Sequence, residues 1–511
     1  MSENKQRAAQ AGHMGYGSRL KEQPADELVQ SAFAHEVADG VLLYHGMSLA
    51  DLAYCVMLCE CALIPPPARP PLLRGLLELH TIPADQFPFD PVYGDIYTNR
   101  EQALRERVPP ESAADGWLRL GRARRESSTV GYLITARGRL LGLIEAHAAL
   151  IAVLLRLAAQ HRVTLMPDYT YLQKAHPTTL AHYLLTFAAP LLRDAERLRA
   201  AYARLNQSPM GGGSVNGSRL PLDRARAAEL LGFEGIAAHT RDAMWQPDVA
   251  IEVAADVVIL MTTLDRLAED LYIFATEEFG YLTLADAHSR TSVIMPQKKN
   301  PYSLAYVRGA ARASSAALHT IIATNQTPSG QPDNRIFAYG DLPRALENAT
   351  RAVQLLTGVL ERAEWHTERM AARAAEGFSG ATDLGDYLSE AAALDPRTAH
   401  RLIGYAVRAA LEAGQPSSTP ISSAALDQAA QALIGRTLNL PDAAVRNAQA
   451  ALAIVESRRG LGGASADSVT ALLADYQARH QEYQWWEDQE QVRLEMVEQT
   501  LLTIARAIAE G

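Results

Sequence analysis

The chain is poor in cysteine and in aromatic residues. It contains 3 Cys among 511 residues, and 6% of its residues are aromatic. So few cysteines cannot build a disulfide scaffold, and they fit a reducing compartment. The scarcity of aromatic residues, together with an abundance of Ala, Leu, Arg and Glu, favours helix over sheet.

A surplus of positive charge and an apolar leader are also missing. The net charge is −10 and the isoelectric point is about 5.8. Nucleic acid is therefore not expected as a partner, because binding phosphates requires a basic surface. The first twenty residues contain no apolar signal region, and the apolar run 148–155 is broken by Arg156, far short of a membrane span. We expect a cytoplasmic protein that binds no membrane.

The three cysteines, Cys55, Cys59 and Cys61, do not match a metal site. Their spacing is C-x3-C-x-C, which fits neither zinc nor iron–sulfur templates. They lie in an apolar segment, 25–64, that is expected to be helical. We interpret them as core residues.

Long apolar helices dominate the middle of the chain. They are expected at 130–162, 179–205, 248–279, 302–324 and 341–372. Helices of this length reach roughly 35–50 Å and, being apolar over much of their surface, must pack against one another. Because no strand-like alternation is found, the predicted fold is all-α with three parts. These parts are an N-terminal helical domain (1–127), a central long-helix bundle (128–372) and a C-terminal helical domain (373–511).

A glycine-rich segment, 208–218, lies between two of these helices. No strand precedes it and no Lys-Ser/Thr pair ends it, so it is neither a dinucleotide nor a P-loop site. Clustered backbone N–H groups in such a loop can hold a carboxylate as well as a phosphate. The alternative interpretation is a flexible linker.

A second loop, 291–301, directly precedes a long helix. It carries Ser292, Lys298, Lys299 and Asn300. A loop of this composition at a helix N-terminus suits an anionic ligand, because Lys neutralises a carboxylate while Asn and backbone N–H groups orient it. The alternative is a solvated basic loop.

The amino-acid sequence of this loop resembles that of a known family. The pattern Ser-x-x-Met-Pro-x-Lys-x-Asn-Pro resembles the signature loop of the fumarase/aspartase superfamily, and Met-Pro-Gln-Lys-Lys-Asn-Pro is typical of argininosuccinate lyase. Residues 164–177 are similar to that family's T-x-M-P-G-Y-T-H-L-Q-x-A-Q-P, and residues 121–127 to its G-R-S-R-N-D-Q. The resemblance covers roughly residues 95–311.

The resemblance implies a homotetramer whose active sites are shared by three subunits. Members break a C–N or C–O bond β to a carboxylate and release fumarate, without metal or organic cofactor. Removing the proton creates an aci-carboxylate dianion, which requires concentrated positive charge and a positioned base. By position in the motif, Ser292 is that base, and Lys298 and Asn300 bind the carboxylate that is activated.

The other motifs supply further substrate-binding residues by resemblance. Thr170 corresponds to the family's substrate-binding Thr, and Gln173 lies in the same motif. Arg124 corresponds to the family's Arg, and Thr98 and Asn99 lie near the region that binds the other carboxylate.

Two residues at the expected proton donor differ from the family. The family's His is Tyr171 here, and the Glu with which that His pairs is Ala305. We interpret this joint change as a rebuilt acid site, with Tyr171 or a water molecule protonating the amine. A phenol with an ordinary pKa near 10 can do so when suitably placed. His176 and His182 are alternatives.

Further departures concern the amine half of the substrate. Arg125 replaces the family's Asn, and segment 329–337 lacks the Tyr and Gln that hold the arginine end. Loss of such hydrogen bonds changes discrimination by roughly 10⁴–10⁵-fold. The residues expected to form fumarate are thus retained, whereas the residues expected to bind the amine half of the substrate differ from those of the family.

The predicted function is a C–N lyase that eliminates fumarate from an N-substituted aspartate in a reversible reaction. Argininosuccinate is the first candidate substrate. An aminopolycarboxylate of the ethylenediamine-disuccinate type is the second, because its extra carboxylate suits Arg125 or Arg335. The rival from another class is a non-catalytic homologue. Fumarase-like hydration and adenylosuccinate cleavage carry less weight.

Overall fold

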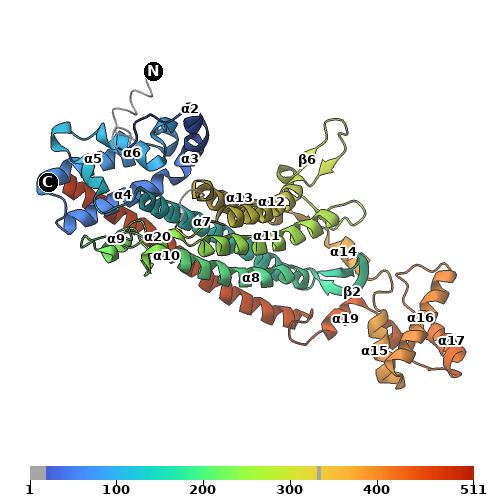
Figure 1. Ribbon diagram of the computed structural model, residues 1–511. Coiled ribbons are helices and arrows are strands. Elements are labelled where there is room, and N and C mark those ends of the chain that lie inside the picture. The colour runs from blue at the N-terminus through green and yellow to red at the C-terminus, as the bar shows by residue number, and fades with distance from the viewer. Residues whose placement is uncertain (1–18, 331–334) are drawn as a thin grey trace.

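The computed structural model describes residues 19–330 and 335–511. The described chain is an elongated bundle of long helices with a smaller helical group at each end (Figure 1). The bundle consists of α7 (Arg124–Gln160), α8 (Leu180–Leu205), α11 (Asp248–Phe274), α12 (Tyr302–Thr324) and α13 (Arg335–Arg362). The all-α prediction with a central long-helix bundle is confirmed.

The last bundle helix differs from its prediction. Instead of running from 341 to 372, α13 ends at Arg362. Residues Glu364–Trp365 then form strand β8, which pairs with β5 (Leu282–Thr283), and α14 (Thr367–Ala374) follows. The long-range strand pairing thus interrupts a segment that its local sequence would continue as helix.

The N-terminal group contains α2 (Asp26–Leu28), the π-helix η2 (Val29–Phe33), α3 (Ala34–Ala38), α4 (Gly40–Glu60), α5 (Arg69–His80) and α6 (Ile96–Arg105). Short 3₁₀ turns connect these helices at Pro66–Ala68, Ala84–Gln86, Pro91–Tyr93, Pro110–Ser112 and Asp115–Arg119. The segment 25–64, expected to be helical, is helical from Asp26 to Glu60 apart from one interruption. The interruption lies at Asp39, between α3 and α4, and the next residue, Gly40, passes so close to Phe89 that a Cβ would lie 2.6 Å from its ring. Cys55 and Cys59 are buried as expected, whereas Cys61 is only partly buried.

Short strands contradict the expectation that none would form. The longest pair, β1 (Leu165–Thr170) and β2 (Gln173–Thr179), makes an antiparallel hairpin with an irregularity between Pro167 and Tyr169. Its turn residues, Tyr171 and Leu172, have positive φ angles of 55° and 56°, which usually call for Asn or Gly. The remaining strands and short helices are β3 (Gln207–Ser208), β4 (Gly235–Ile236), β6 (Arg290–Thr291), β7 (Lys299–Asn300), α9 (Arg224–Leu230), α10 (Thr240–Trp245) and the 3₁₀ turn Asp286–His288.

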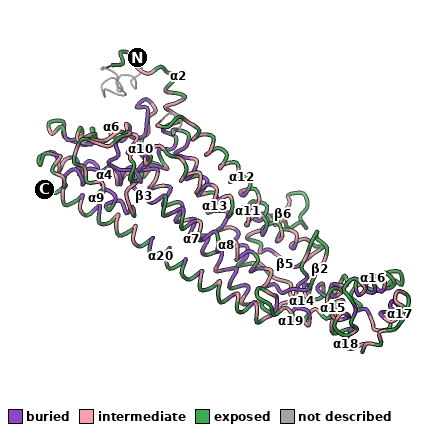
Figure 2. The backbone as a smooth tube through the Cα atoms, turned by 60° about the horizontal axis from the view of Figure 1, so that its bottom comes forward, coloured by how far each residue is buried: buried purple, intermediate pink, exposed green. Residues whose placement is uncertain are grey.

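The C-terminal part contains two different structures. Helices α15 (Ala381–Ala392), α16 (Pro396–Glu412), α17 (Ser423–Ile434) and α18 (Asp442–Asn447) enclose a small core of their own. After α19 (Ala451–Ser457), the long helix α20 (Ala466–Glu510) runs back along the bundle and packs on α5, α7 and α8, with its outer face exposed (Figure 2). Trp486 packs edge-on against Tyr202, whereas Trp485 is exposed.

Two helices, α4 and α7, are long and apolar enough to span a membrane by length and composition alone. However, 83% and 72% of their most apolar windows are buried inside the protein. Their composition is explained by the core they form.

Two glycines let these helices cross closely. A Cβ on Gly46 would lie 2.4 Å from the carbonyl oxygen of Gly131, and a Cβ on Gly131 would lie 2.4 Å from Cγ of Met47. Because backbone is involved on both sides, neither contact can be relieved by a side-chain rotation alone.

The substitution Gly131→Ala is therefore expected to force α4 and α7 apart. We expect the free energy of unfolding to fall by about 1–3 kcal/mol, the usual cost of overpacking. The matched control is Gly142→Ala on the same helix, where a Cβ would meet nothing within 4 Å. Thermal unfolding of the two variants compares them directly, and equal melting temperatures would contradict the close crossing.

Candidate active site

The signature loop is held at its base and projects at its tip. Strands β6 and β7 pair across the base, the Nζ atom of Lys299 lies 2.7 Å from Oδ1 of Asp286, and the Asn300 side-chain amide donates to the carbonyl of Arg290 at 2.9 Å. The loop extends beyond the bundle at one end (Figure 1). At its tip Val293 and Ile294 are exposed.

Ser292 lies in a tight turn of this loop. Its Oγ atom accepts a hydrogen bond from the backbone N–H of Met295 at 3.2 Å, and the Lys298 N–H donates to the Met295 carbonyl at 3.1 Å. A donor directed at a hydroxyl oxygen stabilises its deprotonated form. The turn therefore favours the base role predicted for Ser292.

A cavity of about 480 Å³ lies beneath the loop. Lys298 and Asn300 line it from the loop, and Tyr272, Thr276 and Glu277 line it from the end of α11 and the turn that follows. The two residues predicted to bind the activated carboxylate thus share one cavity, with a lysine supplying positive charge.

The β1–β2 hairpin presents three predicted residues. Thr170 and Gln173 pair with each other at its end, and Tyr171 in the turn is 99% exposed. The hairpin is anchored by a hydrogen bond between the hydroxyl groups of Tyr169 and Tyr281, and burial raises the pKa of Tyr169. The end of the hairpin therefore points away from its own bundle.

The two alternative proton donors differ in their surroundings. The ring nitrogens of His182 lie 3.1 Å from the Thr178 hydroxyl and 3.1 Å from the Gly462 carbonyl, so both are occupied within the fold. His176 is exposed on β2. His182 is thus engaged within the fold and partly exposed, whereas His176 is exposed, as Tyr171 is.

Arg124 lies at the other end of α7, in its first turn. Its Nη1 atom is 3.0 Å from Oδ2 of Asp95, and Oδ1 of Asp95 accepts the backbone N–H of Thr98 at 2.7 Å as the N-cap of α6. Thr98 also lines a cavity of about 230 Å³. Asn99 is buried, and its side chain bonds the backbone of Asp90 and Asp95. Asn99 thus shapes the loop that holds Asp95.

The neighbours of Arg124 serve the fold. The carboxylate of Glu126 accepts the backbone N–H groups of Gly211 at 3.1 Å and Gly213 at 2.5 Å. Burial raises the pKa of Glu126, against the opposing effect of Arg122. The glycine-rich segment therefore holds a carboxylate, as its composition allowed, but that carboxylate belongs to the chain itself. Sequence reasoning missed this role of Glu126.

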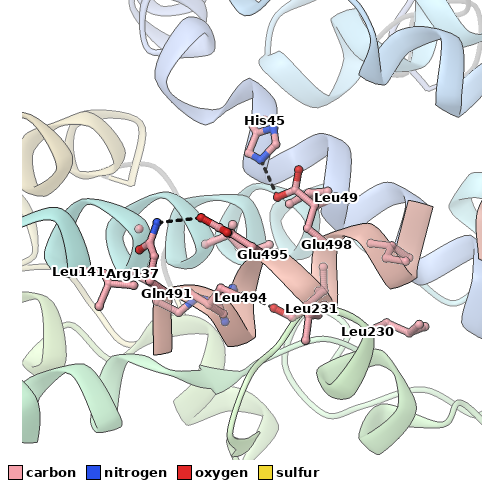
Figure 3. Close-up of a pocket in the computed structure, with 14 residues that line it drawn as sticks. His45, Leu49, Arg137, Leu141, Leu230, Leu231, Gln491, Leu494, Glu495 and Glu498 are labelled. Carbon is pink, nitrogen blue, oxygen red and sulfur yellow. Dashed lines mark hydrogen bonds and ion pairs between the residues drawn. The ribbon is translucent and has the colours of Figure 1, made fainter. Parts of the chain in front are cut away.

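A separate cavity of about 250 Å³ lies between α4, α7, α9 and α20 (Figure 3). His45 and Glu498 both line it, with Nε2 and Oε2 3.2 Å apart, and this hydrogen bond lowers the pKa of Glu498. Arg137 in its wall is satisfied by Asn206 and the Leu231 carbonyl. None of the predicted site residues lines this cavity, so we regard it as part of the docking of α20.

The predicted residues separate into two groups within one chain. Helix α7 has 37 residues and is therefore roughly 55 Å long. Arg124 begins it, and the hairpin with Thr170 and Tyr171 follows its end. The signature loop lies toward the hairpin end, opposite α6 (Figure 1). One chain thus brings Ser292, Lys298 and Asn300 together but leaves Arg124, Thr98 and Asn99 far away.

Comparisons with known proteins agree with the motifs. A family model described as lyase matches residues 74–313. The argininosuccinate lyase of Methanoculleus marisnigri is 39% identical over 363 residues, covering 70% of this chain and 73% of that protein. The argininosuccinate lyase of Methanosarcina acetivorans is 31% identical over 494 residues, covering 96% and 95%.

The fold is also similar to those of solved structures. EDDS lyase in complex with formate has a TM-score of 0.84 and 28% identity, covering 96% of this chain and 97% of that one. A class II fumarase from Schistosoma mansoni, at 13% identity and a TM-score of 0.68, shares the fold. The chain therefore belongs to the fumarase/aspartase superfamily, close to argininosuccinate lyase, and is a carbon–nitrogen lyase that releases fumarate.

Proposed function

We propose that this chain acts as a cytoplasmic homotetramer in amino-acid metabolism, with argininosuccinate as its first candidate substrate. The proposal of an oligomer rests on one separation. Arg124 lies at the start of α7, whereas Thr170 and the loop that carries Ser292 lie toward its other end. A complete site requires residues from more than one copy, since a rigid helix of roughly 55 Å cannot fold back on itself. The exposed Tyr171 and Leu172 at the hairpin end are then covered by another subunit.

The proposed elimination proceeds in two proton transfers. Ser292 removes a proton from the carbon next to one carboxylate, and Lys298 and Asn300 stabilise the aci-carboxylate dianion that forms. The C–N bond then breaks, and its electron pair stays on the nitrogen. Tyr171, or a water molecule beside it, protonates the departing amine. Arg124 and Thr170 hold the substrate throughout.

The identity of the amine half is the finer part of the proposal. Arg125 forms an ion pair with Glu36, so it offers no surplus charge to a second carboxylate. This favours argininosuccinate over an ethylenediamine-disuccinate-type substrate as the first candidate. The likeness to EDDS lyase keeps the latter as the second candidate. Residues 331–334 of the predicted amine-reading segment 329–337 lie outside the described residues, as does the side chain of Arg335.

The proposal is tested by following fumarate through its ultraviolet absorbance. Purified protein is given argininosuccinate and then a panel of N-substituted aspartates. We expect release from argininosuccinate. If fumarate is released only from another member of the panel, the proposed reaction stands and the substrate is that compound. If no compound releases fumarate, the non-catalytic homologue is favoured.

A further inference from the structure

The β1–β2 hairpin ends in a pair of predicted substrate-binding residues. Thr170 pairs with Gln173 at this end, and Tyr169 pairs with Lys174 directly behind them. The register is irregular between Pro167 and Tyr169, so strand pairing alone does not fix where the end of the hairpin lies. The contacts that the Tyr169–Lys174 pair makes with other elements therefore decide the position of Thr170 and Gln173.

Side chains anchor both members of this pair. On β1, the hydroxyl group of Tyr169 shares a hydrogen bond with that of Tyr281. On β2, the Nζ atom of Lys174 donates to Oε2 of Glu376 at 2.5 Å. The side chains of Lys174 and Glu376 are 17% and 30% exposed, so water and salt screen this ion pair less than a fully exposed one. The ion pair is thus the anchor of β2, as the tyrosine pair is the anchor of β1.

Glu376 is itself held by the C-terminal part of the chain, where α14 lies beside the hairpin (Figure 1). Its Oε2 atom also accepts Nη1 of Arg373 on α14 at 2.7 Å. The next residue, Gly377, donates its backbone N–H to Oγ of Ser417 at 3.1 Å. Partial burial raises the pKa of Glu376, but the hydrogen bonds and charges of Lys174 and Arg373 outweigh it and lower that pKa below its usual value. The carboxylate therefore stays ionised at neutral pH and joins α14 to β2.

We propose that Glu376 is a positioning residue for the elimination and acts through Lys174 on the end of the hairpin. This inference rests on the proposed function. Gln173, Lys174 and Arg373 line one cavity of about 320 Å³, so the ion pair lies next to a residue predicted to bind substrate. Without the carboxylate, Lys174 and Arg373 lose the counter-charge that they share and repel each other. The end of β2 is then displaced, and a misplaced binding residue holds its substrate less tightly.

The substitution Glu376→Gln is expected to raise KM for the best substrate of the panel by roughly 3–30-fold, because a charge-assisted hydrogen bond is lost. Since Thr170 holds the substrate before and during the reaction alike, kcat is expected to change by less than about 3-fold. Initial rates of fumarate release over a range of substrate concentrations separate the two constants. The control is Glu412→Gln on α16, which removes the exposed partner of Arg408 and is expected to change neither constant.

A double-mutant cycle with Lys174→Met tests whether Glu376 acts through Lys174. Methionine keeps the aliphatic part of the lysine and removes its charge. If the contact between the two side chains positions the hairpin, Lys174→Met and the double variant are both expected to raise KM about as much as Glu376→Gln alone. Lys174→Met leaves Glu376 paired with Arg373, so this variant decides the matter even where Glu376→Gln fails to fold.

Two results would overturn the inference. Additive effects on KM would mean that Glu376 and Lys174 act separately. A wild-type KM together with a lower melting temperature would mean that their contact only stabilises the fold. Release of fumarate from no compound of the panel by the wild-type protein would instead overturn the proposed function.

Discussion

Replacing Ser292 by alanine is expected to reduce the rate of fumarate release by roughly 10²–10⁴-fold, the usual contribution of a general base. The hydroxyl lies in a loop whose Met295 N–H points at Oγ, and alanine removes this hydroxyl as a proton acceptor. Strands β6 and β7 still pair across the base of the loop without this side chain, so the fold is expected to survive. Initial rates on the best substrate of the panel measure the effect.

The control for this substitution is Ser389→Ala on α15. The Ser389 hydroxyl donates to the Gly385 carbonyl at 3.1 Å and lies in the C-terminal helical group. Its removal is expected to leave turnover unchanged. Full turnover by the Ser292→Ala variant would mean that a different group removes the proton, and the proposed mechanism would then be abandoned.

The Ser292→Ala variant also tests whether the site is shared between subunits, when its subunits are mixed with those of a separate Arg124→Ala variant. Each variant alone is expected to be nearly inactive. After mixed subunits have been unfolded and reassembled at equal amounts, about one quarter of the sites contain both native residues if the two come from different subunits, because each position is native with probability one half. Recovery of activity near that fraction is expected. Mixed tetramers without any recovery would place both residues in one subunit.

The sequence predicts the long helices well because their cause is local. An apolar face over many turns requires burial wherever the helix lies. The hairpin was not predicted, since its turn uses Tyr171 and Leu172 at positive φ in place of Asn or Gly. The end of α13 was not predicted either, because it depends on pairing between residues 282–283 and 364–365, which are distant in the sequence.

The candidate site shows the same limit at residues 121–127. The motif identifies an arginine-rich turn but cannot assign its members, because their partners come from elsewhere in the chain. Arg122 binds Asp51 on α4, and Glu126 binds the glycine-rich loop. Only the folded arrangement separates these supporting residues from Arg124, whose side chain is 36% exposed. The resemblance to the family predicts the role of Arg124, and the structure shows that its side chain is held by Asp95.

The substitution Asp51→Asn is expected to lower the free energy of unfolding by about 3–5 kcal/mol, because it leaves two buried arginines without a counter-charge. Asp51 on α4 is 1% exposed, and it lies 3.1 Å from Nη2 of Arg100 and 2.8 Å from Nη1 of Arg122. It also accepts the Ser127 hydroxyl at 3.0 Å. Asparagine keeps the shape but replaces one acceptor oxygen by a donor facing a guanidinium.

Urea unfolding at a fixed protein concentration measures this loss, since the proposed assembly would make stability depend on concentration. The control is Glu482→Gln, which removes the exposed partner of Arg199 and is expected to change stability by less than about 1 kcal/mol. Because Arg122 precedes Arg124 by two residues, any folded Asp51→Asn enzyme is also expected to bind substrate less tightly. A variant as stable as the control would show that Asp51 does not anchor this turn, and the support inferred for Arg124 would then have to come from other partners, Asp95 among them.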